Sequence, residues 1–284
     1  MIIVQLLGGL GNQMFQYAFG KSLAEKHNCK LLLDTSLLLN RVPCGITFAE
    51  YRLDVFNLSS RLATDKDIPL YTQKRSIKNI LFRALHFMKL YFKGFKYVRY
   101  LKLQFNSKYK QLPENIYLEG YWQSEKYFKE IELVIRKDFT LNLELKGRIA
   151  RMADQISSSL SAAVHIRRGD YLKYSDYHGL SDQNYISKAI KILVEKHPMI
   201  HFFIFSDDID WCVENLKFDY PITFITQENT GSNDIEHFYL MTLCKHFIIA
   251  NSTFSWWAAW LSEFTDKTVI APAKWLTKPK LNLI

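Results

Sequence analysis

The second half of the chain alternates short apolar segments with longer amphipathic ones, at a spacing of about 20 to 25 residues. The apolar segments have the length and composition of buried strands and comprise Ser161–His165, His201–Phe205, Ile222–Ile225, Phe247–Ala250 and Val269–Ala271. Helix-like segments lie between them. Strands and helices that alternate in this way form parallel βαβ units. We therefore predict an α/β protein with a doubly wound parallel sheet in this half.

The N-terminus predicts a further βαβ unit. Ile2–Leu7 has the pattern of a buried strand, and Gly8–Gly11 follows as a loop. Asn12 can cap a helix that runs to about His27, and Leu31–Asp34 is the next strand. Ile116–Trp122 is predicted as a later strand, followed by a helix-rich stretch that ends near Ser157. We place the domain boundary there, which gives domains 1–157 and 158–284.

Composition limits the class of protein. A chain of 284 residues with 48% hydrophobic and 23% charged residues is globular and can bury one large core or two modest ones. It has no apolar run of about 18 residues, and Met1–Leu7 lacks the basic flank of a signal peptide. The four cysteines show no CxxC spacing, which argues against zinc and a disulfide scaffold. We expect a cytoplasmic protein.

The net charge of +9 has a local origin. Eleven of the 37 basic residues, and none of the 28 acidic ones, lie within segment 74–110 and its flanks. Apolar residues recur at helical spacing over Ile77–Phe105, with Gly94 as a possible break, so we predict an amphipathic helix. Such a helix can bind an anionic membrane surface peripherally, or it can be an ordinary helix with a solvated basic face. Nucleic-acid binding is not favoured, because no recognition motif accompanies the charge.

The sequence HIRRGDY, residues 165–171, predicts a phosphate site. It follows the strand at Ser161–His165, and ligands of open α/β sheets bind at the carboxyl ends of strands. Arg167 and Arg168 suit phosphate, since a guanidinium donates two parallel hydrogen bonds and keeps its charge. Asp170 can hold one guanidinium in place. The alternative is a surface arginine pair beside an aspartate in a turn.

A second phosphate element follows the strand at Phe247–Ala250. Hydroxyl groups and backbone N–H groups at the start of a helix form an anion site. The candidate residues are Asn251, Ser252, Thr253 and Ser255. Plain helix capping is the alternative for each, although the neighbouring arginines favour a diphosphate held between two strand ends.

Two further patterns allow more than one interpretation. Tyr121, Trp122 and Gln123 suit a sugar, because aromatic faces stack on pyranose rings and an amide serves hydroxyls; core packing of the aromatic residues is the alternative. Asp207 and Asp208 resemble a metal-binding carboxylate pair, but acids at a helix start more often act as caps, which we favour.

The glycine spacing at Gly9 and Gly11 is that of a dinucleotide-binding loop. Met14 stands where the third glycine belongs, and Asp34 is the only acid near the expected distance. Nicotinamide binding is therefore not favoured.

HIRRGDY resembles a motif of the α1,2-fucosyltransferases. Three more stretches are similar to that family in the expected order, namely Gly8–Gly20, Gly120–Phe128 and Cys244–Trp257, and the similarity is weakest over Leu37–Leu112. The resemblance implies a GT-B-like fold with two Rossmann-like domains facing a cleft. It also implies an acceptor-side N-terminal domain and a GDP-sugar site on the C-terminal domain.

The resemblance implies an inverting, metal-independent enzyme that moves L-fucose from GDP-β-L-fucose to the 2-hydroxyl of galactose, in bacterial surface polysaccharide synthesis. No cofactor is expected, and the acceptor would be a galactose-terminated oligosaccharide or a lipid-linked glycan. Another linkage, another GDP-sugar, or a non-catalytic glycan- or nucleotide-binding module are the alternatives.

The resemblance also assigns roles to residues. Arg167 would stabilise charge on the departing phosphate with Asp170 orienting it, and His165 and Arg168 would contribute to the donor site. Asn12 and Gln13 would face the sugar or phosphate. The acceptor's base is open among Asp170, Asp176 and His178. Glu236 is our candidate for guanine, because His237 occupies the position where the family pattern has an acid.

Overall fold

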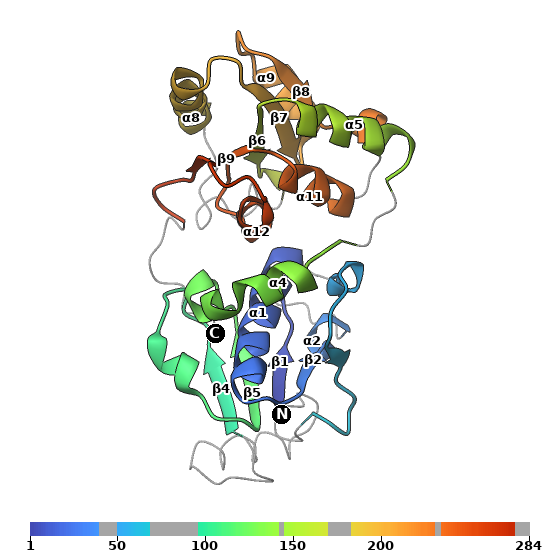
Figure 1. The fold of residues 1–284 in the computed structure, drawn as a ribbon, viewed down its shortest axis with the longest axis vertical. Helices are drawn as coiled ribbons and strands as arrows, with labels where there is room; N and C mark the ends of the chain where they lie inside the picture. Colours follow the sequence, from blue (N-terminus) through green and yellow to red (C-terminus); the bar gives the residue numbers. More distant parts are fainter. Residues whose placement is uncertain (40–49, 69–95, 142–144, 170–182, 231–233, 276–284) are drawn as a thin grey trace. The chain divides into compact units, whose positions relative to one another are not determined.

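The computed structural model describes residues 1–39, 50–68, 96–141, 145–169, 183–230 and 234–275 of the 284-residue chain (Figure 1). The chain divides into two compact units, Met1–Asn142 and Leu143–Ile284. The boundary predicted near residue 157 therefore lies too late in the sequence. Helix α5 (Gly147–Ser158) packs against α10 and α11 of the second unit, because its buried side chains Ile149, Met152 and Ile156 face that core.

The first unit contains a parallel sheet with the order β3-β2-β1-β5-β4. Its strands are β1 (Ile2–Gln5), β2 (Leu31–Asp34), β3 (Arg61–Leu62), β4 (Lys96–Tyr100) and β5 (Ile116–Gly120). Its helices are α1 (Leu10–Lys26), α2 (Ser36–Leu39) and α4 (Glu132–Asp138), with short 3-10 turns η1 (Leu53–Val55), η3 (Ser107–Gln111), η4 (Glu125–Tyr127) and η5 (Lys129–Ile131). The predicted βαβ unit at the N-terminus is present as β1, α1 and β2.

Helix α1 lies directly on the sheet. A Cβ added at Gly20 would stand 2.4 Å from a methyl carbon of Val4 and 2.8 Å from one of Leu31, so glycine permits this close approach. Contrary to the predicted cap at Asn12, the helix begins at Leu10 with Gly9 as its N-cap residue. The chain can turn early because Gly8 adopts a φ of +74°, which glycine tolerates.

The predicted amphipathic helix over Ile77–Phe105 is wrong in its last part. Lys96–Tyr100 forms strand β4, which pairs in parallel with β5. Six of the eleven basic residues lie in segment 69–95, outside the described residues. Of the others, Arg99 forms an ion pair with Glu119 at 3.0 Å, and Lys110 forms one with Glu130. The described part of segment 74–110 is thus partly neutralised by acids.

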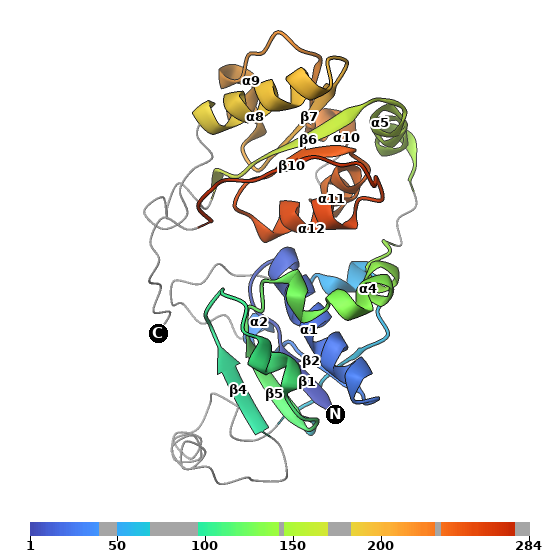
Figure 2. The ribbon, with the colours of Figure 1, turned by 60° about the vertical axis from the view of Figure 1, so that its left-hand side comes forward.

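The second unit contains a parallel sheet with the order β10-β9-β6-β7-β8. Its strands are β6 (Ser161–Ile166), β7 (His201–Ser206), β8 (Ile222–Phe224), β9 (His246–Ile248) and β10 (Val269–Ile270). Its helices besides α5 are α8 (Gln183–Lys196), α9 (Ile209–Asn215), α10 (Gln227–Thr230), α11 (Asp234–Thr242) and α12 (Thr253–Leu261). Helices lie on both faces of this sheet, as Figure 2 shows, so the predicted doubly wound fold is confirmed.

Alternating strand residues build the core of the second unit. Val164 and Ile166 of β6 and Phe202 of β7 face a buried cluster that includes Ile190 and Leu193 of α8. All five side chains are at most 1% exposed. This packing fixes the position of the carboxyl end of β6, and therefore the position of Arg167 and Arg168, which follow it.

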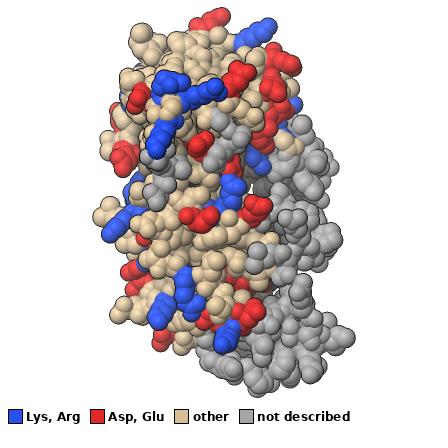
Figure 3. Space-filling view, turned by 90° about the vertical axis from the view of Figure 1, so that its right-hand side faces the viewer, with Lys and Arg blue, Asp and Glu red and all other residues tan. Residues whose placement is uncertain are grey.

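Surface charge and hydropathy add two observations. On the face drawn in Figure 3, basic and acidic side chains of the described residues are interspersed. Within the described ranges, we find no helix whose length and apolar character would allow it to cross a membrane.

Candidate active site

The candidate site lies at the carboxyl edge of the second sheet. β6 is the central strand, and the chain runs from it to β7 and β8 on one side before returning to β9 and β10 on the other. The strand order therefore reverses between β6 and β9, the position where open α/β sheets bind ligands. Arg167 follows β6, and α12 begins shortly after β9. The two predicted phosphate elements are thus brought to the same reversal point.

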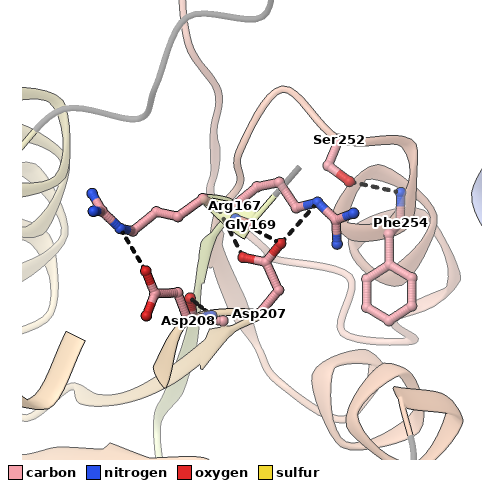
Figure 4. Close-up of polar contacts among 8 residues, drawn as sticks. Arg167, Gly169, Asp207, Asp208, Ser252 and Phe254 are labelled. Atoms are coloured by element: carbon pink, nitrogen blue, oxygen red, sulfur yellow. Dashed lines mark hydrogen bonds and ion pairs between the residues drawn. The ribbon is translucent and has the colours of Figure 1, made fainter. Parts of the chain in front are cut away.

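Arg167 is held by Asp207, which follows the neighbouring strand β7. Its Nε lies 3.2 Å from a carboxylate oxygen of Asp207. The same carboxylate accepts hydrogen bonds from the backbone N–H groups of Arg168, at 2.8 Å, and Gly169, at 3.1 Å. In Figure 4 the Arg167 side chain extends toward the start of α12, where Ser252 and Phe254 lie. Asp207 therefore fixes both the guanidinium and the backbone that carries it.

The glycine of the motif has a steric reason. A Cβ added at Gly169 would stand 2.8 Å from a carboxylate oxygen of Asp207. That separation is shorter than real Cβ contacts, so a larger residue would displace the carboxylate. The close packing of Gly169 against Asp207 preserves the hold on Arg167.

Arg168 is held separately by α9 and the residues before it. Its Nε donates to Asp208 at 3.1 Å, and its guanidinium carbon lies 3.6 Å from the ring centroid of Trp211. Asp208 is in turn oriented by its backbone N–H, which donates to the Ser206 hydroxyl at 3.0 Å. Arg168 is more enclosed than Arg167, with 18% against 34% of its side chain exposed.

These contacts correct the prediction that Asp207 and Asp208 act as helix caps. Asp208 stands at the N-cap position of α9, but its side chain makes no capping hydrogen bond. Both carboxylates instead form ion pairs with the arginines after β6. Within the part of the chain that the structure describes, no three His, Cys, Asp or Glu residues are grouped as a metal site.

His165 is the last buried polar residue before the arginines. Its side chain is 6% exposed, and its ring lies 5.8 Å from that of Phe254, centroid to centroid. Burial, and next the positive charge of Arg167, lower the pKa of His165 from 6.5 to about 3. Its Nδ1 is buried and has no hydrogen-bond partner among the described residues. At neutral pH this group is therefore a neutral imidazole beside the arginine.

The residues at the start of α12 are partly engaged within the fold. The Ser252 hydroxyl caps the helix by accepting from the Phe254 N–H at 3.4 Å, and the buried Ser255 hydroxyl donates to the Ser252 carbonyl at 3.3 Å. The Asn251 amide donates to the Trp275 carbonyl at 3.1 Å. Capping, the alternative interpretation, is thus observed at Ser252, while Thr253 is half-buried at the first position of the helix.

In the first unit, Gln13 is a bracing residue. Its side chain is fully buried and donates to the carbonyls of Gly8, at 2.8 Å, and Glu50, at 2.7 Å. Its carbonyl oxygen accepts from the Arg52 N–H at 3.1 Å. Gln13 therefore ties the glycine loop to the chain at 50–52 instead of facing a ligand. Asn12 is half-buried, and its side-chain oxygen accepts from the Gln123 amide at 2.7 Å.

Trp122 packs in the core, so the structure supports the alternative interpretation of this residue. It is fully buried, and four aromatic rings surround it with centroids 4.5 to 5.8 Å away, those of Phe19, Tyr100, Tyr109 and Tyr127. Its ring is not available to stack on a sugar. Tyr121 and Gln123 are half-buried and stay predicted acceptor contacts.

The remaining predicted residues divide by location. Glu236 is half-buried in the first turn of α11, and its role with guanine stays a prediction. The adjacent His237 has its Nε2 2.9 Å from the Thr230 hydroxyl. Asp170, Asp176 and His178 lie outside the described residues.

Comparison with known sequences decides the family. The sequence profile of glycosyl transferase family 11 matches residues 1–282. This chain belongs to glycosyl transferase family 11. The predicted similarity to α1,2-fucosyltransferases is thereby confirmed, and the protein is a fucosyltransferase-type glycosyltransferase.

Two Escherichia coli relatives span almost the whole of this family 11 glycosyltransferase. An alpha-1,2-colitosyltransferase is 36% identical and matches 99% of this chain and 94% of its own length. The O-antigen biosynthesis glycosyltransferase WbnK is 31% identical, over 98% and 97%. Human galactoside alpha-(1,2)-fucosyltransferase 1 is 27% identical over 51% of this chain and 42% of its own.

Solved structures establish the fold of this family 11 glycosyltransferase. NodZ alpha-1,6-fucosyltransferase, in a crystal soaked with GDP-fucose, aligns with a TM-score of 0.51 and 15% identity over 92% of each chain. POFUT1 in complex with GDP-fucose aligns with a TM-score of 0.50 and 14% identity over 96% and 97%. The predicted GT-B-like fold is confirmed.

Sequence reasoning missed the function of Asp207 and Asp208. The signal that could have found it is their position directly after β7, because residues that follow neighbouring parallel strands emerge at the same edge. Pairing of β6 with β7, from Ser161 with His201 to Ile166 with Ser206, places these carboxylates beside the arginines.

Proposed function

We propose that this family 11 glycosyltransferase moves L-fucose from GDP-β-L-fucose to the 2-hydroxyl of a galactose, forming an α1,2 linkage with inversion. The observation that carries the proposal is Arg167, held by Asp207 at the point where the second sheet reverses its strand order. Similarity to an alpha-1,2-colitosyltransferase and to galactoside 2-alpha-L-fucosyltransferases supports the α1,2 linkage. Similarity in fold to NodZ and POFUT1, whose crystals contained GDP-fucose, supports the donor.

The reaction is a single displacement. The acceptor oxygen attacks C1 of fucose opposite the leaving group, the bond from C1 to the β-phosphate oxygen breaks, and the acceptor proton passes to a base. Negative charge grows on the departing phosphate, and a preorganised guanidinium stabilises it more than it stabilises the ground state. Arg167 has this role in our proposal. Because Asp207 already holds the guanidinium in place, little free energy is needed to orient it during the reaction.

The other donor contacts follow from position. Arg168 supplies a second positive charge, and the N–H groups at the start of α12 face the reversal point from the β9 side. His165 contributes as a neutral donor or acceptor, because burial and Arg167 hold its pKa at about 3. Glu236 is proposed for guanine, and the base is sought among Asp170, Asp176 and His178.

A second candidate differs in the sugar transferred. The 36% identical relative is an alpha-1,2-colitosyltransferase, and colitose differs from fucose by the absence of the 3-hydroxyl. A site that binds a hydroxyl discriminates strongly against an analogue that lacks it, because its polar groups are then left unpaired. The ratio of kcat/KM values for GDP-fucose and GDP-colitose therefore separates the two candidates.

The test is GDP release by the purified protein from GDP-fucose, with and without lactose, in EDTA. Lactose-stimulated release supports a metal-independent fucosyltransferase that accepts terminal galactose, and NMR of the product then gives the linkage. Loss of activity in EDTA that Mn²⁺ restores contradicts the metal-independent mechanism. Failure to bind GDP contradicts the proposal and favours a glycan-binding module.

The cellular setting is a further part of the proposal. Similarity to WbnK, a glycosyltransferase of O-antigen biosynthesis, supports surface polysaccharide synthesis. A lipid-linked acceptor would bring the enzyme to the cytoplasmic face of the membrane. Segment 74–110 would make the peripheral contact. Co-sedimentation with anionic vesicles that weakens as salt rises is the expected result, and absence of co-sedimentation contradicts this contact.

A further inference from the structure

Trp122 has an unusual backbone conformation. Three described residues other than glycine have a positive φ, and two of them, Asn28 and Asn115, are of the type that tolerates it. Trp122, with a φ of +53°, is the third. A bulky side chain is rarely found in this region, because its Cβ approaches the backbone. The surroundings of Trp122 must therefore hold it there.

Four aromatic rings form a cage around the Trp122 ring and keep the residue in this conformation. They belong to Phe19, Tyr100, Tyr109 and Tyr127. Phe19 lies 4.5 Å and Tyr109 5.2 Å from the Trp122 ring, centroid to centroid. On another side the ring packs against Gly120, where an added Cβ would stand 2.9 Å from it and 2.2 Å from the Tyr100 carbonyl oxygen. The indole N–H is buried without a hydrogen-bond partner among the described residues, although buried Trp residues usually find one. Packing, not hydrogen bonding, thus maintains this conformation.

The unusual backbone redirects the chain after β5. The Trp122 carbonyl accepts from the Ser124 N–H at 2.8 Å, which closes a three-residue turn around Gln123. The Gln123 amide then donates to the side-chain oxygen of Asn12 at 2.7 Å, in the first turn of α1. An extended conformation at Trp122 would continue along the strand and would not present Gln123 to Asn12. The pair of amides depends on the turn at Trp122.

We propose that Trp122 is a positioning residue that holds Gln123 and Asn12 for the hydroxyl groups of the acceptor sugar. Amides both donate and accept hydrogen bonds, which suits sugar hydroxyls. Backbone strain that the surrounding structure enforces is concentrated at functional sites, where it sets the geometry of groups that bind. This inference rests on the proposed function, since it deepens the description of the acceptor side of that reaction.

The experiment compares Trp122→Ala with Trp122→Gly. Both variants lose the ring, but glycine adopts a positive φ without steric cost and alanine does not. We expect kcat/KM for lactose to fall by about 100-fold in Trp122→Ala and by clearly less in Trp122→Gly, because a small displacement of a binding group has effects of this size. GDP affinity, measured by calorimetry, stays unchanged, since the arginines predicted to bind GDP lie in the second unit and this inference moves Asn12, first predicted to face the sugar or phosphate of the donor, to the acceptor. Equal losses in the two variants overturn the inference.

A control separates positioning from loss of stability. Phe139 is also buried in the first unit, but its ring packs against Tyr17 and Phe56, which are not among the rings around Trp122. Phe139→Ala should lower the melting temperature and leave kcat/KM for lactose intact at a temperature where the variant is folded. Should Trp122→Ala not fold, Trp122→Phe carries the same test with a loss of about tenfold, since it keeps an aromatic ring in the cage.

A spectroscopic readout distinguishes this inference from the proposed function. Both Trp122→Ala and Trp122→Gly lose the ring current of the indole, so the side-chain amide resonances of Gln123 should move further from their wild-type positions in Trp122→Ala than in Trp122→Gly, and stay near them in Phe139→Ala. Equal shifts of the Gln123 resonances in Trp122→Ala and Trp122→Gly overturn the inference even if the enzyme is active. A wild-type protein that does not act on lactose, with Gln123 resonances that differ between the two variants, contradicts the proposed acceptor while the positioning by Trp122 stands.

Discussion

The carboxyl edges of the two parallel sheets differ in their chemistry. In the second unit the edge is charged, with Arg167 paired to Asp207 and Arg168 paired to Asp208. In the first unit the Asn12 and Gln123 amides are hydrogen-bonded to each other after β1 and β5, next to the aromatic rings that surround Trp122, and the charges near the ends of β4 and β5 are paired as Arg99 with Glu119. Two sheets of the same topology class therefore present different surfaces at equivalent edges.

The difference indicates how a glycosyltransferase can bind its donor and its acceptor with different chemistry. A diphosphate needs fixed positive charge, and carboxylates that hold arginines supply it without leaving the guanidinium mobile. A sugar acceptor is uncharged and needs groups that both donate and accept hydrogen bonds. The chemistry of each edge thus matches one of the two substrates in our proposal.

The charged edge is most directly broken by Arg167→Ala. We expect kcat/KM to fall by about 1,000-fold, because the charge on the leaving phosphate loses its stabilising partner. Arg167→Lys keeps the charge but not the planar fork of the guanidinium, so its activity should lie between that of the wild type and that of Arg167→Ala. GDP release from GDP-fucose with lactose measures both. Activity like that of the wild type in Arg167→Ala would contradict the assignment of Arg167.

The hold on that arginine is tested by Asp207→Asn. The substitution keeps the shape but removes the charge that pairs with Arg167 Nε and accepts from two backbone N–H groups. We expect a fall of about 100-fold in kcat/KM through misplacement of the guanidinium. Asp208→Asn, which affects Arg168 instead, is the matched control and should cost less. A larger loss in the control would reverse the roles of the two pairs.

The substitution Arg168→Ala distinguishes the roles of the two arginines. Arg168 is stacked on Trp211 and is more enclosed than Arg167, so we expect it to bind the donor more than it stabilises the transition state. The loss should be about tenfold, the size of one charge-assisted hydrogen bond, and should appear mainly in KM for GDP-fucose. A loss in kcat as large as that of Arg167→Ala would remove the distinction between them.

The two units should also differ in how their stability responds to pH between about 6.5 and 4. The described histidines with a lowered pKa, His165, His201 and His246, all lie in the second unit. The imidazole of His246 is 1% exposed, and burial followed by His197 lowers its pKa to about 4; Lys245 adds to this effect and Asp266 opposes it.

The sign of the effect follows from where each state binds its proton. The unfolded chain protonates His246 from about pH 6.5 downward and the folded protein only near pH 4. The free energy of unfolding should therefore fall as pH drops through this window, by about 1–3 kcal/mol for this group. His246→Gln keeps an acceptor for the Thr268 N–H and should flatten the dependence. His201→Gln, at a half-buried position, should flatten it less; an unchanged slope in His246→Gln would contradict the assignment.

Much of the fold could be predicted because it depends on local patterns. Runs of apolar residues such as Ser161–His165 and His201–Phe205 are strands in the structure because they are buried on both faces. The position of Arg167 at a strand end could be predicted from the sequence for the same reason. The helix predicted over Ile77–Phe105 was wrong at Lys96–Tyr100, since pairing with β5 overrode its local pattern.

The sequence by itself determined the family, the parallel α/β class and the arginines of the candidate site, because motif order and apolar periodicity are written along the chain. Only the tertiary structure decided that Asp207 holds Arg167, that Gln13 braces a loop and that Trp122 is caged in the core. These three facts depend on partners far away in the sequence. Which side chains meet at a sheet edge is settled by strand order and register, and neither is encoded in the segment that carries the residue.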